Sequence, residues 1–204
     1  MSSNRRALIL VENLSVPFDR RVWQECTTLR DAGWTVHVIC PQGEKRDTEP
    51  EVEIDGIRIH RYPLRAATGG PAGYLKEYGS ALWHTARLAR KVGPVDVVHA
   101  CNPPDLLFLP ALWLKRRGAR FVFDQHDLVP ELYLSRFDRG KDLLYRGVCA
   151  LERRTYRAAD IVYLVDSWSY FVEVFFMISG YVIVMSLRRH TTMRGFLFDR
   201  FVRI

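Results

Sequence analysis

The sequence predicts an α/β protein with a doubly wound parallel sheet, followed by a hydrophobic segment that is a candidate membrane helix. Strand-like and helix-like patterns alternate through residues 1–163, as in a sheet built from right-handed crossovers. Several strand-like runs are aliphatic without alternation, which is typical of parallel strands covered on both faces. The composition changes near residue 165, after which three of the four methionines and six of the eleven phenylalanines lie. These observations predict a domain at residues 1–163 and a tail at residues 164–204.

The strands are predicted from short apolar runs. Residues 7–11 form an unbroken aliphatic run, which indicates a central strand. Residues 56–62 alternate, so one face of that strand is expected to be more solvated. The remaining strands are predicted at residues 35–40, 96–101, 119–123 and 160–165.

The helices are predicted from 3.6-residue spacing and from their end signals. Asp19 can cap a helix whose apolar positions Val22, Cys26 and Leu29 share one face, and Gly33 ends it. Further helices are predicted at residues 74–92, 106–117 and 142–158, and residues 42–53 and 66–73 are expected to be polar or glycine-rich connections. Pro110 should bend the helix at residues 106–117, because proline removes a backbone hydrogen bond.

Charge and cysteine content narrow the possible classes of protein. The 30 Lys and Arg residues exceed the 23 Asp and Glu residues, giving a net charge of +7, but the two signs are mixed along the chain. Mixed charge argues against a nucleic-acid groove, and a basic surface that faces anionic lipid headgroups or a phosphorylated substrate explains the excess of positive charge as well. The four cysteines are too few and too widely spaced for a disulfide scaffold, which indicates a reducing compartment, and no C-x-x-C pair suggests a structural zinc site. No metal is expected, because His99 and Cys101 supply only two ligands and nothing near them in sequence completes a set.

The tail contains an uncharged run at residues 174–187, which is 14 residues long. A membrane-spanning helix needs about 20 residues, and extending this run backward takes in Asp166 and Glu173. Arg188 and Arg189 follow it, which would put its end on the cytosolic side of a membrane. We expect a membrane segment here and a cytosolic amino-terminal domain; the alternative is a buried helix or strand of a soluble domain.

Three loops follow predicted strands at the edge of the sheet where open α/β proteins bind ligands. In the first loop, Arg20 and Arg21 enter a helix N-terminus and could hold an anion; alternatively they are solvated and Asp19 is only a cap. The loop has no glycine, so it is not a dinucleotide or P-loop motif. In the second loop, Asn102 and Asp105 flank two prolines and either line a ligand site or cap the next helix.

The third loop places His126 between Asp124 and Asp127, directly after a buried strand. A neighbouring carboxylate can orient an imidazole ring and raise its basicity. His126 could therefore take or position a proton of a hydroxyl group. The alternative is a histidine with a purely structural role.

Several ordered segments together resemble the amino-terminal domain of glycosyltransferase family 4. They are Val-Pro-Phe-Asp-Arg-Arg-Val-Trp-Gln-Glu at residues 16–25, Val-Val-His-Ala-Cys-Asn-Pro-Pro-Asp at residues 97–105, Phe-Asp-Gln-His-Asp-Leu-Val-Pro-Glu at residues 123–131 and Glu-Arg-Arg-Thr-Tyr-Arg-Ala-Ala-Asp at residues 152–160. The resemblance covers residues 5–163. It implies one Rossmann-like half of a GT-B fold and a retaining transfer of a sugar from a sugar nucleotide to an acceptor.

The resemblance also implies roles for particular residues. His126 corresponds to the histidine that lines the reaction centre, with Asp127 beside it, so these two are the expected catalytic residues. The expected substrate-binding residues are Arg20, Arg21, Asn102, Asp124 and Glu131. The expected partners are a sugar-nucleotide donor and a sugar or lipid-linked acceptor at the cytoplasmic face of a membrane, in envelope polysaccharide or glycoconjugate synthesis. No cofactor is expected.

Two departures from the family are visible. The Glu-x7-Glu pattern of the second, donor-binding domain is absent, because no two glutamates in the chain are eight residues apart. Residues 174–183 and 198–204 instead resemble a membrane segment of the acyltransferase-3 family. The sequence therefore predicts a glycosyltransferase half without its donor site; the alternatives are a noncatalytic, membrane-tethered acceptor-binding module and a fragment of a membrane acyltransferase.

Overall fold

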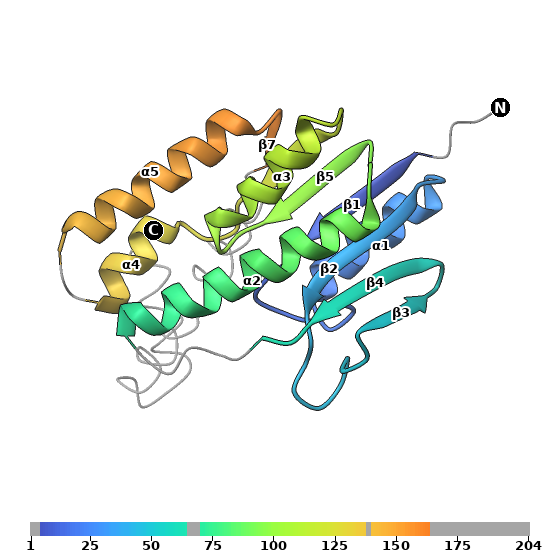
Figure 1. Ribbon diagram of the computed structural model, residues 1–204, viewed down its shortest axis with the longest axis horizontal. Coiled ribbons are helices and arrows are strands. Elements are labelled where there is room, and N and C mark those ends of the chain that lie inside the picture. Colours follow the sequence, from blue (N-terminus) through green and yellow to red (C-terminus); the bar gives the residue numbers. More distant parts are fainter. Residues whose placement is uncertain (1–4, 65–69, 138–139, 164–204) are drawn as a thin grey trace, which may run out of the picture. The chain divides into compact units, whose positions relative to one another are not determined.

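A computed structural model describes residues 5–64, 70–137 and 140–163, and these residues lie in one unit of the chain, Met1–Leu164. Figure 1 shows a single sheet with helices on its two faces. The strands are β1 (Arg6–Leu10), β2 (Thr35–Pro41), β3 (Glu51–Ile54), β4 (Ile57–Tyr62), β5 (Val97–Cys101), β6 (Arg120–Asp124) and β7 (Ile161–Tyr163). The helices are α1 (Arg20–Asp31), α2 (Gly70–Val92), the 3₁₀ turn η1 (Asp105–Leu107), α3 (Phe108–Lys115), α4 (Val129–Phe137) and α5 (Leu143–Ala158).

The sheet has seven strands in the order β3-β4-β2-β1-β5-β6-β7. Every neighbouring pair is parallel except β3 and β4. β2, β4 and β3 lie on one side of the central β1, and β5, β6 and β7 lie on the other. The predicted α/β class with a doubly wound, mostly parallel sheet is therefore confirmed.

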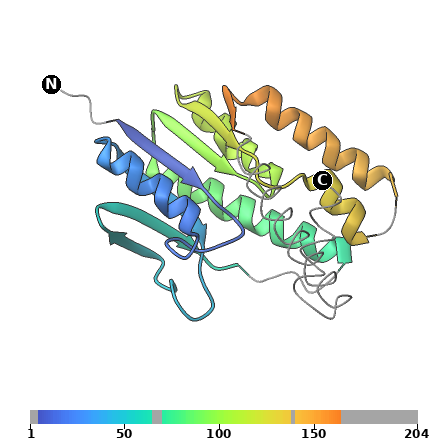
Figure 2. The same ribbon diagram turned by 180° about the vertical axis from the view of Figure 1, so that it is seen from behind.

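The two faces of the sheet each bury one side of the central strand. Leu8 and Leu10 pack in a core with residues of α2, α3 and α5, whereas Ile9 and Val11 pack against α1. Figure 1 shows α2 and α3 over one face, and Figure 2, seen from behind, shows α1 over the other. Burial on both faces explains why β1 is aliphatic without alternation.

The connection predicted at residues 42–53 is wrong at its end, where β3 forms. β3 pairs with β4 across the two-residue turn Asp55-Gly56, and both turn residues have positive φ angles. An Asp-Gly turn of this kind favours a tight hairpin. β3 alternates exposed glutamates with half-buried apolar residues, as expected of an edge strand with one wet face.

Prolines explain the differences at the helix starts. The structure begins α2 at Gly70, inside the segment predicted as a loop, and α4 at Val129, inside the third loop. Pro71 and Pro130 each lie in the first turn of their helix, where a missing backbone N–H costs no hydrogen bond. Pro110 likewise falls in the first turn of α3, so the helix predicted at residues 106–117 is divided into η1 and α3 rather than bent.

Within the described ranges, no helix has both the length and the hydropathy needed to cross a bilayer. The membrane segment predicted at residues 174–187 lies outside those ranges.

Candidate functional site

The candidate site lies where the parallel strands β5 and β6 end side by side. Cys101 at the end of β5 is paired in register with Asp124 at the end of β6. The second and third loops continue directly from these two residues, and α1 reaches the same region from the first loop. The sheet therefore brings together segments that are about 100 residues apart in sequence, as the contact between Arg21 and Asp124 shows.

Asp124 is the centre of the site. Its side chain is 1% exposed, and its Oδ2 accepts contacts from Arg21 Nη1 at 2.5 Å and His126 Nε2 at 2.9 Å. His99 Nε2 lies 3.4 Å from the same oxygen. Burial by itself would raise the pKa of Asp124, but its contacts with the two histidines and the charges of His126 and Arg21 hold it well below its usual range. Asp124 is therefore an anion surrounded by three basic groups.

His126 is held in its protonated form. Burial by itself would lower the pKa of His126, but its contacts with Asp124 and Cys101 outweigh this effect and raise it to about 9. Near neutral pH the imidazole therefore carries both protons and acts as a hydrogen-bond donor rather than as a base. Of the two carboxylates that flank His126 in sequence, Asp124 lies with its Oδ2 2.9 Å from Nε2 of the ring.

His99, Cys101 and Glu25 extend the charged network. His99 Nδ1 lies 3.7 Å from Glu25 Oε2, and Arg21 Nη1 lies 3.5 Å from the other oxygen of that carboxylate. Burial would lower the pKa of His99, but the charge at Cys101 and the contact with Asp124 raise it to about 10. For the Cys101 thiol, burial alone would raise the pKa, but the charge on His99 and contacts with both histidines outweigh this effect and lower it.

Asn102 fixes the backbone of the third loop. It is 1% exposed, and its side-chain oxygen accepts from the backbone N–H of His126 at 2.6 Å and of Asp127 at 3.2 Å. Its amide nitrogen donates to the Asp127 carbonyl at 2.7 Å. The same nitrogen donates to Asp105 at 3.3 Å. Asn102 thus joins the loops after β5 and β6 and sets the position of His126.

The first loop places Arg21 through the start of α1. Asp19 caps this helix by accepting from the backbone N–H groups of Arg21 and Val22, both at 3.2 Å, as the sequence predicts. Farther back, the Val16 carbonyl accepts from the buried guanidinium of Arg61 on β4 at 2.7 Å. These contacts hold the loop on the sheet and point one of its two predicted arginines at Asp124.

The structure brings together only part of the predicted set. Arg21, Asp124 and His126 are in contact, and Asn102 supports them through the backbone. Asp127 takes part through its backbone, since its N–H and carbonyl both bind Asn102. Arg20 and Glu131 are exposed residues in the first turns of α1 and α4.

Sequence reasoning missed Glu25, and it set aside His99 and Cys101 because no further ligand was near them in sequence. That reason does not hold in the structure, because Asp124 on the next strand and Glu25 on α1 complete a group of four donor atoms within 4.8 Å of one another. The available signals were the i, i+4 spacing of Glu25 from Arg21 and the same-side placement of His99 and Cys101 on one strand.

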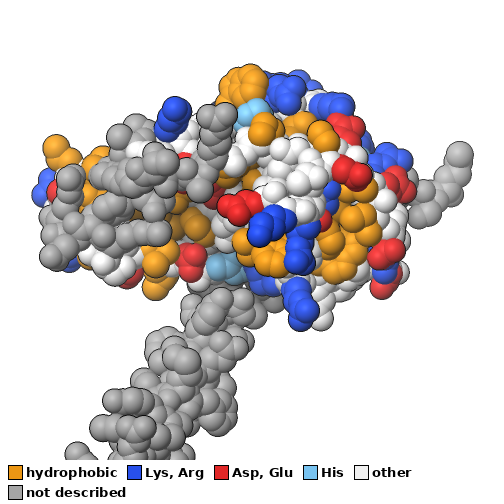
Figure 3. Space-filling model, turned by 90° about the horizontal axis from the view of Figure 1, so that it is seen from below, with side chains coloured by type: hydrophobic (Ala, Val, Ile, Leu, Met, Phe, Trp, Pro, Cys, Tyr) orange, Lys and Arg blue, Asp and Glu red, His pale blue; other side chains and the backbone are white. Residues whose placement is uncertain are grey.

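Figure 3 shows Lys and Arg side chains lying among Asp and Glu side chains on the face it presents. Both signs of charge therefore lie on this face, as the scattered charges of the sequence predict.

Comparison with known proteins places the chain in a family. Residues 19–169 match the family described as "Glycosyl transferase 4-like domain". No curated protein matches the chain significantly. A solved chain of sucrose-phosphate synthase from Thermosynechococcus elongatus resembles it with a TM-score of 0.41 and 14% sequence identity, over 75% of this chain and 98% of that chain. The family match ends at residue 169, so the likeness of the tail to acyltransferases is unsupported and stays a prediction. Because the family match covers well over half of its length, the chain belongs to the glycosyl transferase 4-like domain family.

Proposed function

We propose that the chain provides the acceptor side of a sugar transfer, from a sugar nucleotide to a sugar or lipid-linked acceptor, in envelope polysaccharide or glycoconjugate synthesis. The observation that carries this proposal is the cluster of Arg21, Asp124 and His126 at the carboxyl ends of β5 and β6, in a chain of this family. Open α/β sheets bind their ligands at this edge. The proposal rests on the position of this cluster at the strand ends and on the hydrogen bonds that Arg21 and His126 can donate to a substrate.

In this proposal, His126 donates a hydrogen bond to an oxygen of the reacting sugars. Asp124 orients the ring at 2.9 Å, and Arg21 holds Asp124 in turn. Asn102 fixes the loop that carries the histidine. A donor held in place by such supports stabilises developing charge without having to reorganise during the reaction. Arg20 and Glu131, both exposed, would contact the phosphates or hydroxyl groups of the substrates.

The sugar nucleotide would be bound mainly by a partner lobe. We base this on the absence of a Glu-x7-Glu pattern from the 204 residues. Much of the catalysis of a two-substrate reaction comes from positioning both reactants. We therefore expect the chain alone to bind acceptor sugars and to transfer sugar only weakly.

Calorimetry with separate acceptor and donor probes tests this proposal. The probes are short oligosaccharides, short-chain polyprenyl diphosphate sugars, and uridine and guanosine diphosphate sugars. Acceptor probes should bind, and His126→Ala should weaken that binding by about 10- to 100-fold, as expected for a lost hydrogen bond to a charged group. His84→Ala on α2 is the matched control and should bind normally. The proposal would be contradicted if sugar nucleotides bound and no acceptor probe did. Rapid transfer of radiolabelled sugar by the chain alone would also contradict it.

A noncatalytic acceptor-binding module is the second candidate, because the cluster of Arg21, Asp124 and His126 could bind an acceptor without taking part in a reaction. The two functions differ when a donor-binding lobe of the same family is added to the chain with radiolabelled sugar nucleotide. Transfer that appears with wild type and falls with His126→Ala supports the enzyme half. Acceptor binding that never leads to transfer supports the module.

We also propose that the protein acts at the cytoplasmic face of a membrane. The support for this is the uncharged run at residues 174–187, with Arg188 and Arg189 after it. After cell lysis the full chain should sediment with membranes, and a chain ending at residue 163 should remain in the supernatant. Equal partition of the two chains would show that the tail does not tether the protein.

A further inference from the structure

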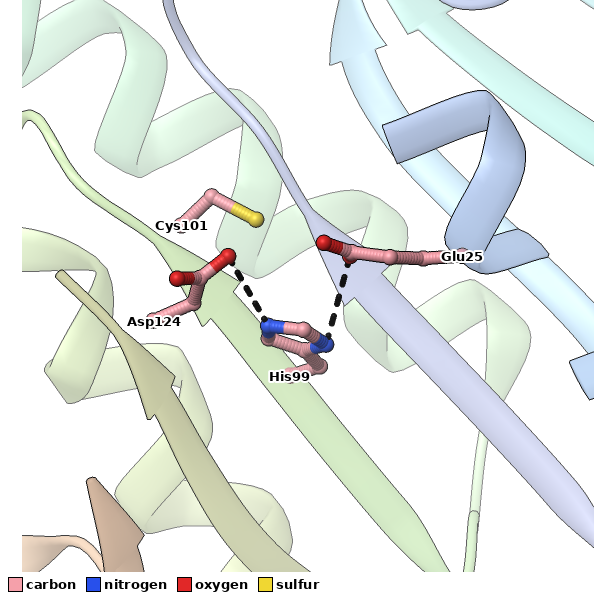
Figure 4. A group of neighbouring side chains, drawn as sticks. All are labelled: Glu25, His99, Cys101 and Asp124. Carbon is pink, nitrogen blue, oxygen red and sulfur yellow. Dashed lines mark ion pairs between the residues drawn. The ribbon is translucent and has the colours of Figure 1, made fainter. Parts of the chain in front are cut away.

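A four-donor cluster lies beside His126, formed by Glu25, His99, Cys101 and Asp124. One ligand atom from each residue lies within 4.8 Å of the other three. Figure 4 shows the His99 ring between the carboxylates of Asp124 and Glu25, with the sulfur of Cys101 near the same space. The residues come from α1, β5 and β6, so the cluster joins a helix to two neighbouring strands.

The donor types match one class of metal ion. An imidazole nitrogen, a thiolate sulfur and two carboxylate oxygens are the ligands that Zn²⁺ takes in tetrahedral sites. Metal–ligand bonds of about 2.0 to 2.3 Å put tetrahedral ligands about 3.5 Å apart. The spacing here therefore needs side-chain movements of about 1 Å, which the side chain of Glu25 can make most easily because it is 26% exposed.

The present contacts of the cluster are loose. His99 Nε2 is 3.4 Å from Asp124 and His99 Nδ1 is 3.7 Å from Glu25, both longer than an ordinary N–H···O hydrogen bond. Among the described residues, His99 Nε2 and Glu25 Oε2 are buried without a hydrogen-bond partner. Buried polar atoms normally have partners, so these two are available as ligands.

The cluster is rich in negative charge. Its two carboxylates and a thiolate bring three negative charges, against the two positive charges of a divalent ion. The guanidinium of Arg21 and the protonated ring of His126 lie 2.5 Å and 2.9 Å from the Asp124 carboxylate. Arg21 is not one of the four donors, but it contacts the donor Asp124. Groups that contact a metal ligand in this way orient it.

We propose that Glu25, His99, Cys101 and Asp124 bind a divalent transition metal ion of the zinc class. The ion would fasten α1 to the ends of β5 and β6. This inference is independent of the sugar chemistry proposed above, and its test uses no transfer assay.

The test is a titration of the full 204-residue chain, freed of metal by a chelator, with Co²⁺ as a spectroscopic substitute for Zn²⁺. One equivalent of Co²⁺ should produce a thiolate-to-cobalt charge-transfer band and the intense d–d bands of a tetrahedral ion. Zn²⁺ should abolish these bands and raise the melting temperature, because a ligand that binds only the folded state stabilises it. Absence of a thiolate band at one equivalent would overturn the proposal.

Variants assign the ligands. Cys101→Ser should lose the thiolate band, whereas Cys149→Ser, a half-buried cysteine on α5, should keep it. His99→Gln should weaken Zn²⁺ binding at least about tenfold, and His84→Gln should not. If either variant fails to fold by circular dichroism, Glu25→Gln, at a half-buried position on α1, replaces it and should weaken Zn²⁺ binding at least about tenfold. A thiolate band that persists in Cys101→Ser, or full affinity in Glu25→Gln, would overturn the assignment.

Discussion

Single residues in this domain hold the strand-end loops by being buried with many partners. Asn102 is the clearest case, since its one side chain bonds to groups of both the second and the third loop. Asp124 does the same with charge, because one carboxylate oxygen meets Arg21 and His126. Substitutions of Asn102 or Asp124 should therefore affect the site by releasing the loops and side chains that these residues hold.

Asn102→Ala should free the third loop. The substitution leaves the backbone N–H of His126 and the Asp127 carbonyl without their partner, and each lost partner of a buried group costs about 1 to 3 kcal/mol. Amide hydrogen exchange at residues 126 and 127 should accelerate, while exchange in β1 stays protected. Unchanged exchange at both amides would show that Asn102 does not hold the loop.

Glu12 gives the domain a specific pH dependence. It follows β1, is 4% exposed, and its Oε1 has no hydrogen-bond partner among the described residues. Burial, helped by the charge of Glu77, raises its pKa from 4.5 to about 8. The folded state therefore holds a proton that the unfolded state releases. The contribution of this Glu12 proton to the free energy of unfolding is fully present below pH 4.5 and is lost as the pH rises to about 8. The loss is at most about 1.4 kcal/mol per pH unit.

Glu12→Gln should remove this slope, because the amide cannot ionise. The variant should gain stability relative to wild type as the pH rises from about 5 to about 8, measured as the free energy of unfolding in urea. Glu44→Gln, at an exposed position in the loop after β2, is the control and should keep the wild-type slope. Parallel curves for wild type and Glu12→Gln would refute the assignment.

At the scale of elements, the sequence predicts those whose signals are local. The aliphatic run of β1 and the Asp19 cap of α1 appear where expected. The signals for β3 and α4 were weaker, since β3 depends on pairing with β4 and α4 starts at residues that also fit a loop. The meeting of Glu25 with His99 and Asp124 could not be predicted, because it depends on strand register and on how α1 packs on the sheet.

The loop after β2 is an element with a strict requirement at Gly43. A Cβ atom there would lie 2.3 Å from the backbone oxygen of Arg46. The loop carries Asp47, which accepts from Ser15 at 2.9 Å and pairs with Arg61 at 3.3 Å, so it also supports the first loop. Its shape therefore affects the position of α1.

Gly43→Ala should destabilise the domain by about 1 to 3 kcal/mol, as overpacking does at rigid sites. The measurement is the urea midpoint of unfolding. Gly79→Ala on α2 is the control, because a Cβ atom there meets nothing within 4 Å and alanine favours helices. A Gly43→Ala protein as stable as the Gly79→Ala protein would show that the loop can rearrange at no cost.

For the whole molecule, the sheet order explains why the site lies between β5 and β6. The chain reverses direction beside β1, and the loops after β1, β5 and β6 meet at one edge of the sheet. Ligand sites of open α/β sheets occur at such reversals. The fold, the family match and the charged cluster together favour a sugar-binding surface at this edge.

The most direct test of this central claim is nuclear magnetic resonance of the histidine side chains during titration with polyprenyl diphosphate sugars and short oligosaccharides. The imidazole signals of His126 and His99 should shift with added acceptor, while those of His37 and His60, on β2 and β4, should not. Acceptor binding that leaves the His126 signals unchanged, or that moves only the signals of His37 and His60, would contradict the central claim.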